Sequence, residues 1–360
     1  NGDGDGRDPD PTDPGCPDID PTELSHGTHV AGTVAARTNN GAGGAGVNWG
    51  GQAATRIMAL RVLGQIQPFT DPNNCGVGYY SDIADAIIYA ADRGARVINM
   101  SLGGGASSST VDSAISYARG LGVTLVAAAG NDFCGPVSYP ARNANVVAVA
   151  ATTNTNARAA YSNCGPEIDV AAPGGSSAAG VVSATWSPAG GHTYASLQGT
   201  SMATPHVSGL VALMISRGIT GPATLQSVLE TTATDLGTAG RDNEFGAGLV
   251  NASAAVAGGS SSTRLRAFSG VSGAGSITVQ SNVVIVSSDG AFTITNAQSG
   301  TKTVFAWQDV NGNGVVDAGD TFGRRDGVVI TAGATTSGVN VTVERYSGAP
   351  LTVAGGGLAR

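Results

Sequence analysis

Apolar residues along the chain follow two patterns, which change near residue 260. In the first part, continuous apolar runs typical of buried strands alternate with segments whose apolar positions recur every three or four residues, as on one face of a helix. The continuous runs, separated by helices, predict an α/β domain with a mostly parallel sheet and helices on both faces. The predicted strands are 56–63, 96–102, 123–129 and 146–151, and the predicted helices begin at residues 26, 81, 110 and about 201.

After the Gly/Ser-rich segment 258–263, apolar and polar residues alternate strictly. The alternation occurs in 276–279, 291–295, 303–307 and 339–343, with Gly, Ser and Asn between these segments. Short alternating segments separated by turn residues predict a small antiparallel β-sandwich. The expected domains are therefore an α/β domain over 1–257, a linker over 258–263, a β-sandwich over 264–346 and a flexible tail over 347–360.

Composition narrows the classes of function. The 360 residues carry a net charge of −8, and Lys302 is the only lysine. A nucleic-acid-binding surface is therefore not expected. No apolar run approaches the length of a membrane span, so we also expect a soluble protein.

The four cysteines suggest an oxidising compartment. Cys16, Cys75, Cys134 and Cys164 lack the close spacings of a zinc site or a redox motif. An even number of cysteines in polar loops predicts two disulfides and hence secretion. Their spacing alone leaves all three pairings open.

The strongest chemical signal is Ser201 at the start of a largely buried helix. The unpaired amides of a first helical turn favour negative charge that develops beside them, which suits a nucleophile. Taken alone, the position also suits a serine that only caps a helix. His26 lies at the start of another predicted helix. Asn131 follows the strand that ends at 129, where an ordinary turn asparagine is the alternative.

Three segments together resemble the subtilisin-like serine peptidases. Gly199-Thr200-Ser201-Met202-Ala203-Thr204-Pro205-His206 is similar to the family's nucleophile segment, Ser25-His26-Gly27-Thr28-His29 to its histidine segment, and Ala129-Gly130-Asn131-Asp132 to its oxyanion segment. The resemblance covers about residues 20 to 257. It implies that Ser201 is the nucleophile, His26 the general base, and Asn131 an oxyanion donor together with the Ser201 amide.

The resemblance also implies a substrate groove and a disulfide pairing. Ser138 would form the floor of the first specificity pocket, where glycine is common in the family, so we expect a shallower pocket. Cys134 and Cys164 fall in segments that enclose this pocket, which favours the pairs Cys134–Cys164 and Cys16–Cys75. The residues expected along the groove are Ser101, Leu102, Gly103, Ala128, Ala129 and Gly130.

The family's triad aspartate has no counterpart in the expected sequence context. In the family it lies in an Asp-Thr-Gly or Asp-Ser-Gly sequence on the first strand, and neither sequence occurs here. We expect a separate N-terminal segment to carry it, with Asp18 or Asp20 as a less suitable substitute. Since loss of the aspartate costs about 3 × 10⁴ in kcat in subtilisin, a family member, this chain alone should be a poor catalyst.

Two acidic segments predict structural calcium. The segment 309–320 places oxygen ligands at positions 1, 3, 5, 9 and 12 of a twelve-residue calcium loop, with glycine at position 6. A plain turn is the alternative for this loop, and a solvated acidic loop is the alternative for the N-terminal segment. The predicted ligands are Asp309, Asn311, Asn313, Val315, Asp317 and Asp320 in the first loop, and Asp3, Asp5, Asp8, Asp10 and Asp13 near the N-terminus.

The sequence thus predicts a secreted serine endopeptidase that acts on proteins or peptides. Two alternatives remain at this point. One is a catalytically incomplete, calcium-dependent binding protein whose β domain carries the function. The other is an esterase that uses the same residues for acyl transfer.

Overall fold

The structure is a computed structural model that describes residues 25–49, 55–64, 76–187, 189–257, 265–273, 275–286, 291–309, 315–317, 320–332 and 334–354. The chain divides into two compact units. The first comprises residues 1–216 and 220–255, and the second comprises 217–219 and 256–360. Each unit is described by itself.

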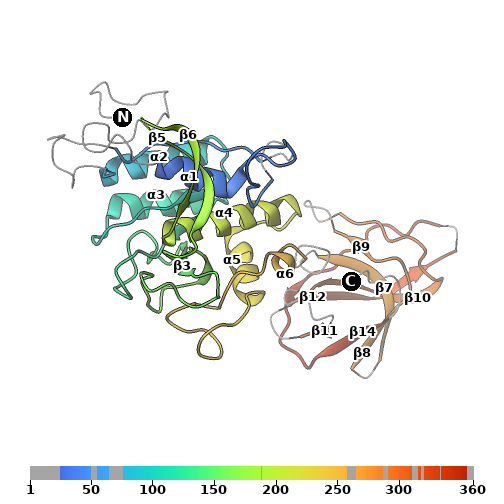
Figure 1. The fold of residues 1–360 in the computed structure, drawn as a ribbon. Helices are drawn as coiled ribbons and strands as arrows, with labels where there is room; N and C mark the ends of the chain where they lie inside the picture. The colour runs from blue at the N-terminus through green and yellow to red at the C-terminus, as the bar shows by residue number, and fades with distance from the viewer. Residues whose placement is uncertain are drawn as a thin grey trace. The chain divides into compact units, whose positions relative to one another are not determined.

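The first unit is built around a parallel sheet with the strand order β1-β2-β3-β4. Strand β3 of this sheet is labelled in Figure 1. Its strands are β1 (Val97–Met100), β2 (Thr124–Ala128), β3 (Val146–Thr152) and β4 (Val170–Pro173). Every residue of β2 and β3 is buried. Burial on both faces explains why these strands are continuously apolar, and the predicted parallel sheet is confirmed.

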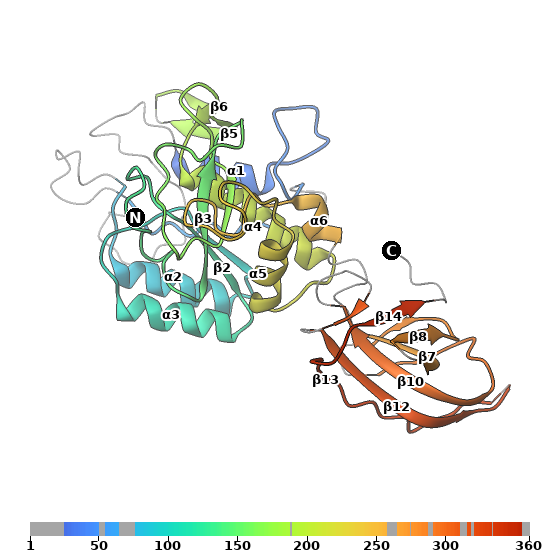
Figure 2. The ribbon, with the colours of Figure 1, turned by 90° about the horizontal axis from the view of Figure 1, so that it is seen from below.

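Helices cover both faces of this sheet (Figure 2). One face carries α2 (Tyr80–Asp92) and α3 (Ser109–Gly120), which pack with Leu125 and Ala127 of β2 in one apolar core. The other face carries α4 (Thr200–Ser216), which contacts all four strands and also α1 (His26–Ala35). Helix α4, whose first turn contains Ser201, is therefore the central helix of the unit.

Smaller elements complete the first unit. Strands β5 (Val181–Ser187) and β6 (Gly191–Leu197) form an antiparallel hairpin, and α1 packs against β5. Helix α5 spans Pro222–Thr231, with proline in its first turn, where its missing N–H is tolerated. Helix α6 spans Ala252–Ala257.

The predicted strand over 56–63 is wrong. Residues 55–64 are described, and their only ladder contact with other described residues is a single bridge between Gly64 and Val77. An apolar segment becomes a strand only when a neighbour supplies hydrogen bonds along its length. Instead, Ile57, Met58 and Leu60 are 47%, 42% and 37% exposed.

The second unit contains a sheet with the strand order β11-β14-β8-β7-β10-β12-β13, with β9 paired to β7. All pairs are antiparallel except β8–β14. The core includes Phe268, Phe305 and Trp307. The strands are β7 (Arg266–Gly273), β8 (Ser276–Val279), β9 (Val284–Ile285), β10 (Gly300–Gln308), β11 (Val315–Val316), β12 (Thr321–Ile330), β13 (Glu344–Arg345) and β14 (Leu351–Ala354).

Three predictions for this unit are corrected. Residues 291–295 and 339–343 alternate in polarity but form no strand, because alternation does not itself provide a pairing partner. The flexible tail predicted from 347 is wrong for 351–354, since β14 pairs with β8 and β11 and buries Val353. The predicted linker over 258–263 lies outside the described residues.

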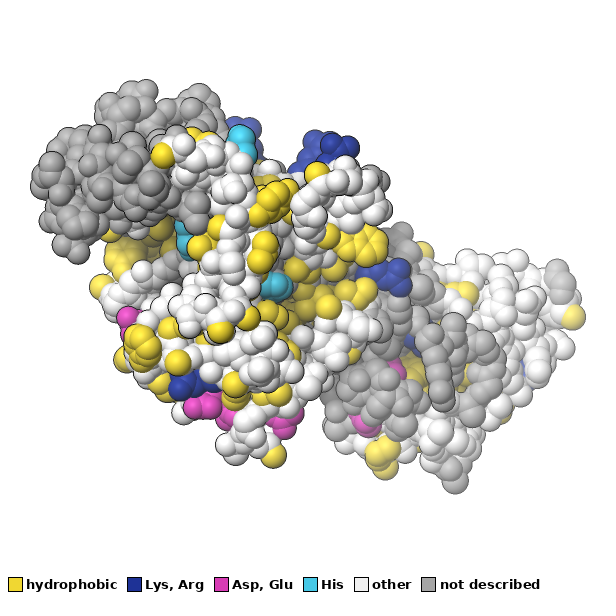
Figure 3. All heavy atoms as spheres, viewed as in Figure 1, with side chains coloured by type: hydrophobic (Ala, Val, Ile, Leu, Met, Phe, Trp, Pro, Cys, Tyr) yellow, Lys and Arg dark blue, Asp and Glu magenta, His cyan; other side chains and the backbone are white. Residues whose placement is uncertain are grey.

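The described residues include no membrane-spanning helix, and the face drawn in Figure 3 shows no broad basic patch. None of the described helices is long and apolar enough to cross a membrane. On the face drawn in Figure 3, the described Lys and Arg side chains lie in small groups separated by uncharged surface.

Candidate active site

Ser201 is the second residue of α4, so its amide lies in the first helical turn. The turn is closed by the amides of Met202 and Ala203, which donate to the carbonyl of Gly199 at 3.0 and 3.3 Å. The Ser201 side chain is half-buried, whereas Met202 and Ala203 are buried. The hydroxyl therefore lies at a helix N-terminus whose partial positive charge favours a developing anion.

Asn131 is fixed by the residue before Ser201. The Thr200 amide donates to Asn131 Oδ1 at 2.9 Å, and the Thr200 hydroxyl donates to the same oxygen at 3.0 Å. A backbone N–H can only donate, so the atom that faces Thr200 is the carboxamide oxygen. The NH₂ group of Asn131 therefore points away from Thr200 and remains a donor for another acceptor.

Gly199 keeps the space between the two predicted oxyanion donors open. A Cβ at this position would lie 3.6 Å from Ser201 N and 3.7 Å from Asn131 Nδ2. The φ angle of Gly199 is +152°, which side-chain-bearing residues rarely adopt. Both nitrogens therefore lie close to one point beside Gly199, which has no side chain there.

Ser101 makes two contacts with Ser201. The Ser101 hydroxyl donates to the Ser201 carbonyl at 2.8 Å, and the Ser201 hydroxyl donates to the Ser101 carbonyl at 3.3 Å. Ser101 directly follows β1, so the carboxyl end of β1 and the N-terminal turn of α4 meet at the predicted nucleophile. This agrees with the general location of sites at the carboxyl ends of parallel strands.

His26 is the exposed first residue of α1, which packs against α4. The helix begins here because Ser25 caps it, its hydroxyl accepting from the Thr28 amide at 3.3 Å. Ser25 is itself anchored, since its amide donates to Trp186 O at 2.6 Å and its carbonyl accepts from Thr185 Oγ1 at 3.0 Å. The backbone that carries His26 is therefore tied to β5.

His29, one turn further along α1, is buried and serves a different purpose. Its Nε2 lies 3.1 Å from Val181 O and 3.2 Å from Ala195 O, so it is the protonated nitrogen. Burial lowers the pKa of His29. The ring joins α1 to both strands of the hairpin as a neutral imidazole.

Ser138 lies between the two segments predicted to line the substrate groove. Its amide donates to Ala129 O at 2.8 Å, and its Cβ would lie 2.9 Å from a Cβ at Gly103. Gly130, with a φ of +108°, faces the Ser138 hydroxyl so closely that a Cβ there would clash with it. The glycines therefore allow Ser138 to fill the space between the segments. Ala128 is buried in β2, and Leu102 packs partly against the core.

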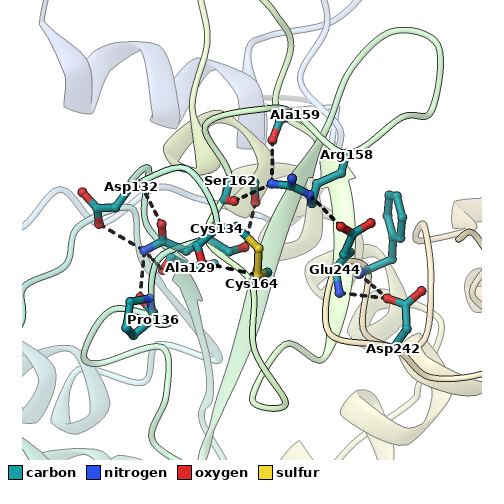
Figure 4. Close-up of a disulfide and its surroundings, with 12 residues drawn as sticks. Ala129, Asp132, Cys134, Pro136, Arg158, Ala159, Ser162, Cys164, Asp242 and Glu244 are labelled. Atoms are coloured by element: carbon teal, nitrogen blue, oxygen red, sulfur yellow. Dashed lines mark hydrogen bonds and ion pairs between the residues drawn. A yellow bond between two sulfur atoms is a disulfide. The ribbon is translucent and has the colours of Figure 1, made fainter. Parts of the chain in front are cut away.

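A disulfide joins Cys134 to Cys164, the pair that the resemblance implies (Figure 4). Asn163 supports the same loop, because its Nδ2 lies 3.2 Å from Ala129 O and 2.9 Å from Pro136 O. Its Oδ1 accepts from the Asp132 amide at 2.6 Å. The loop that follows Asn131 is thus held by a covalent bond and by one buried carboxamide. Cys16 and Cys75 lie outside the described residues.

Sequence reasoning did not assign roles to Thr200 and Asn163. Thr200 lies in the nucleophile segment, so its position was visible, but its contact with Asn131 spans 69 residues of sequence. Asn163 is one of the buried polar residues, and its partners lie 27 to 34 residues away. Burial is not visible in the sequence, so no local pattern marks Asn163 as a support of this loop.

The predicted calcium loop is described in part. Asp309 and Asp320 are buried, at 4% and 1% exposed. Asp320 Oδ2 accepts from Trp307 Nε1 at 3.0 Å and from the Asp317 amide at 3.2 Å. Among the described residues, no cluster of three or more His, Cys, Asp or Glu residues is spaced to hold a metal. Asn311 and Asn313, the side chain of Val315, and Asp3, Asp5, Asp8, Asp10 and Asp13 lie outside the described residues.

Comparison with known sequences identifies the family of this chain. The sequence profile of the Subtilase family matches residues 3–248, more than half of the chain. The chain belongs to the subtilase family. Relatives include an extracellular protease of Xanthomonas campestris, 49% identical over 245 residues, which covers 64% of this chain and 40% of that protein. Subtilisin Savinase of Lederbergia lenta is 42% identical over 232 residues, 64% of this chain and 77% of that protein.

A solved structure agrees with the subtilase assignment. A protease from Pseudoalteromonas arctica matches with a TM-score of 0.57 and 41% sequence identity, covering 65% of this chain and 70% of that chain. The chain spans less than half the length of the Xanthomonas relative. The matched part is that of a subtilisin-type protease.

Proposed function

We propose that this subtilase is a secreted serine endopeptidase in which Ser201, His26 and Asn131 carry the chemistry. The main support is the orientation of Asn131. Thr200 occupies its oxygen, and its NH₂, like the Ser201 amide, lies close to the position of a Cβ at Gly199. Secretion is supported by the disulfide at Cys134 and by an extracellular relative. The substrates are proteins or peptides.

The reaction follows from these positions. Ser201 Oγ attacks the carbonyl carbon of the scissile peptide bond, and its proton passes to His26. The negative oxygen of the tetrahedral intermediate accepts hydrogen bonds from Asn131 Nδ2 and the Ser201 amide. His26 then protonates the leaving amine, and water hydrolyses the resulting acyl-serine by the reverse sequence of proton transfers.

The direct test is hydrolysis of an unstructured protein such as casein by the full chain. Ser201→Ala should remove the activity. Ser216→Ala changes an exposed serine at the other end of the same helix and should retain it. Casein hydrolysis by Ser201→Ala at the rate of an active Ser216→Ala variant would contradict the proposal. Turnover of simple esters without peptide hydrolysis would favour the esterase alternative.

We also propose that the carboxylate partner of His26 comes from a separate N-terminal segment that adds a strand to the sheet, and not from Asp18 or Asp20. Support comes from β1, the edge strand of the described parallel sheet, and from the exposed apolar side chains of Ile57, Met58 and Leu60. An exposed apolar segment and an edge strand without a described neighbour each suit an added strand. Intact-mass analysis of active preparations should find a second peptide with Asp-Thr-Gly or Asp-Ser-Gly. The proposal would be refuted if a single polypeptide is active and either Asp18→Asn or Asp20→Asn abolishes that activity.

The position of Ser138 supports a preference for small side chains before the cleaved bond. Its hydroxyl and Cβ lie between Gly103 and Gly130, where a glycine would leave room. Ser138→Gly should raise kcat/KM for Phe relative to Ala substrates by about tenfold, the lower range for small changes in pocket volume. An unchanged Phe/Ala ratio would contradict this preference.

Structural calcium in the loop 309–320 remains a proposal, supported by the ligand spacing and by the buried carboxylates of Asp309 and Asp320. Calcium should raise the unfolding temperature of the full chain relative to chelator, and Asp317→Asn should reduce that rise. A rise of the same size in the variant would assign the effect to another site, such as the N-terminal aspartates.

A further inference from the structure

Pro205 leaves one carbonyl of α4 without its usual helical partner. In an α-helix the carbonyl of residue 201 accepts from the amide of residue 205, but proline has no N–H. The affected carbonyl belongs to Ser201, the proposed nucleophile, and Pro205 is buried within the helix. A buried carbonyl that loses its donor is costly unless another group replaces it.

The Ser101 side chain supplies that replacement. Its hydroxyl donates to Ser201 O at 2.8 Å. Its oxygen in turn accepts from Asn99 Nδ2 at 3.0 Å. Because an amide NH₂ can only donate, the Ser101 hydroxyl is left to direct its own proton to Ser201.

Ser208 fixes the orientation of Asn99. Its hydroxyl donates to Asn99 Oδ1 at 2.8 Å, which places the oxygen toward Ser208 and the NH₂ toward Ser101. The hydrogen bonds thus run in one direction, from Ser208 through Asn99 and Ser101 to Ser201. Ser208 is buried, at 2% exposed.

Sequence spacing explains how four separated residues meet. Asn99 and Ser101 are two residues apart along β1 and its end, so their side chains point to one face. Ser201 and Ser208 are seven residues apart, two turns of α4, and share one side of the helix. Since α4 packs against β1, the pairs face each other.

We propose that Ser208, Asn99 and Ser101 form a positioning relay that holds the backbone of Ser201, with the Ser101 hydroxyl in place of the helical donor that Pro205 lacks. This inference rests on the proposed peptidase function. Ser101 is then a positioning residue through its side chain, in addition to the groove role expected for its backbone.

The test measures how fast an aryl phosphonofluoridate labels Ser201 in the full chain, with mass mapping and thermal unfolding on the same samples. Ser101→Ala should slow labelling about tenfold, the size of one lost hydrogen bond to a buried acceptor. In the Pro205→Ala background, where an amide can again donate to Ser201 O, the same substitution should slow labelling less than about twofold.

Asn99→Asp provides a second route to the same prediction. A carboxylate accepts from both Ser208 and Ser101, which turns the Ser101 proton away from Ser201 while the side-chain shape is kept. It should also slow labelling about tenfold and therefore decides the matter even where Ser101→Ala folds poorly.

The outcomes separate this inference from the function on which it rests. The relay would be overturned, and the peptidase proposal would stand, if the wild-type chain is labelled at Ser201 but Ser101→Ala slows labelling equally in the wild-type and Pro205→Ala backgrounds. An unchanged labelling rate in Asn99→Asp would have the same meaning. A folded wild-type chain that is never labelled at Ser201 would overturn both.

Discussion

The oxygen and the nitrogen of the Asn131 side chain have separate tasks. The oxygen accepts two hydrogen bonds from Thr200, which fixes the loop, and the nitrogen faces the space beside the Ser201 amide. A substitution can therefore remove one task and retain the other.

Asn131→Asp keeps an oxygen for Thr200 and removes the donor. We expect kcat to fall about 10²–10³-fold with a small change in KM, the magnitude known for the equivalent donor of subtilisin, a member of the family. Asn131→Ala should lose as much kcat and also some thermal stability. Wild-type kcat in Asn131→Asp would exclude this side chain as an oxyanion donor.

At the scale of residues, the sequence indicates the proposed catalytic side chains better than the residues that hold them in place. Ser201 was identified because three segments together resemble the family's motifs, since a serine before a buried helix alone also suits a cap. Thr200, Asn99 and Asn163 act through partners many residues away, which no local pattern encodes.

At the scale of elements, the contact between α1 and α4 contains two neutral histidines. Burial lowers the pKa of both His29 and His206, and proximity to His29 lowers that of His206 further. His206 donates through Nδ1 to Met202 O at 2.8 Å, whereas His29 donates through Nε2. Burial therefore favours the uncharged form of both rings, of which His29 joins α1 to the β5–β6 hairpin and His206 bonds within α4.

Stability should consequently fall as the pH decreases below 6.5. Both pKa values are depressed in the folded state from an ordinary value of 6.5, so the unfolded chain binds more protons below that pH. The unfolding temperature should drop between pH 7 and 5.5, and His206→Gln should flatten that drop. His192→Gln, which changes an exposed histidine on β6, serves as the control and should leave the slope unchanged. A flat wild-type profile would contradict this prediction.

The disulfide holds the loop beside Asn131 to the segment that contains Asn163. It closes 30 residues of sequence, for which chain entropy predicts a stabilisation of about 3–4 kcal/mol. The double substitution Cys134→Ser with Cys164→Ser should lower the unfolding temperature and reduce kcat/KM. An unchanged unfolding temperature would show that Asn163 and its hydrogen bonds hold the loop without the covalent bond.

Elements with strong apolar periodicity were predictable from the sequence. Strands that depend on a particular pairing partner were not. The helices at 26, 81 and 110 and the buried strands β2 and β3 follow directly from apolar spacing. The segment 56–63 and the short alternating runs of the second unit depend on which neighbour pairs with them, which composition does not encode. Strand β14 was missed for the same reason, since four residues at 351–354 gain a partner only in the folded sheet.

For the molecule as a whole, the first unit contains the proposed catalytic residues, and the family match ends at residue 248. The second unit contains its own apolar core and a sheet of eight strands. The central claim thus depends on the first unit, and on whether Ser201 is an activated nucleophile.

Covalent labelling followed by mass mapping tests this claim most directly. The full chain, treated with an aryl phosphonofluoridate, should acquire one adduct at Ser201, and His26→Ala should prevent it because the hydroxyl then lacks its base. A folded, unlabelled chain, or an adduct on another serine, would contradict the account and leave the calcium-dependent binding function as the better description.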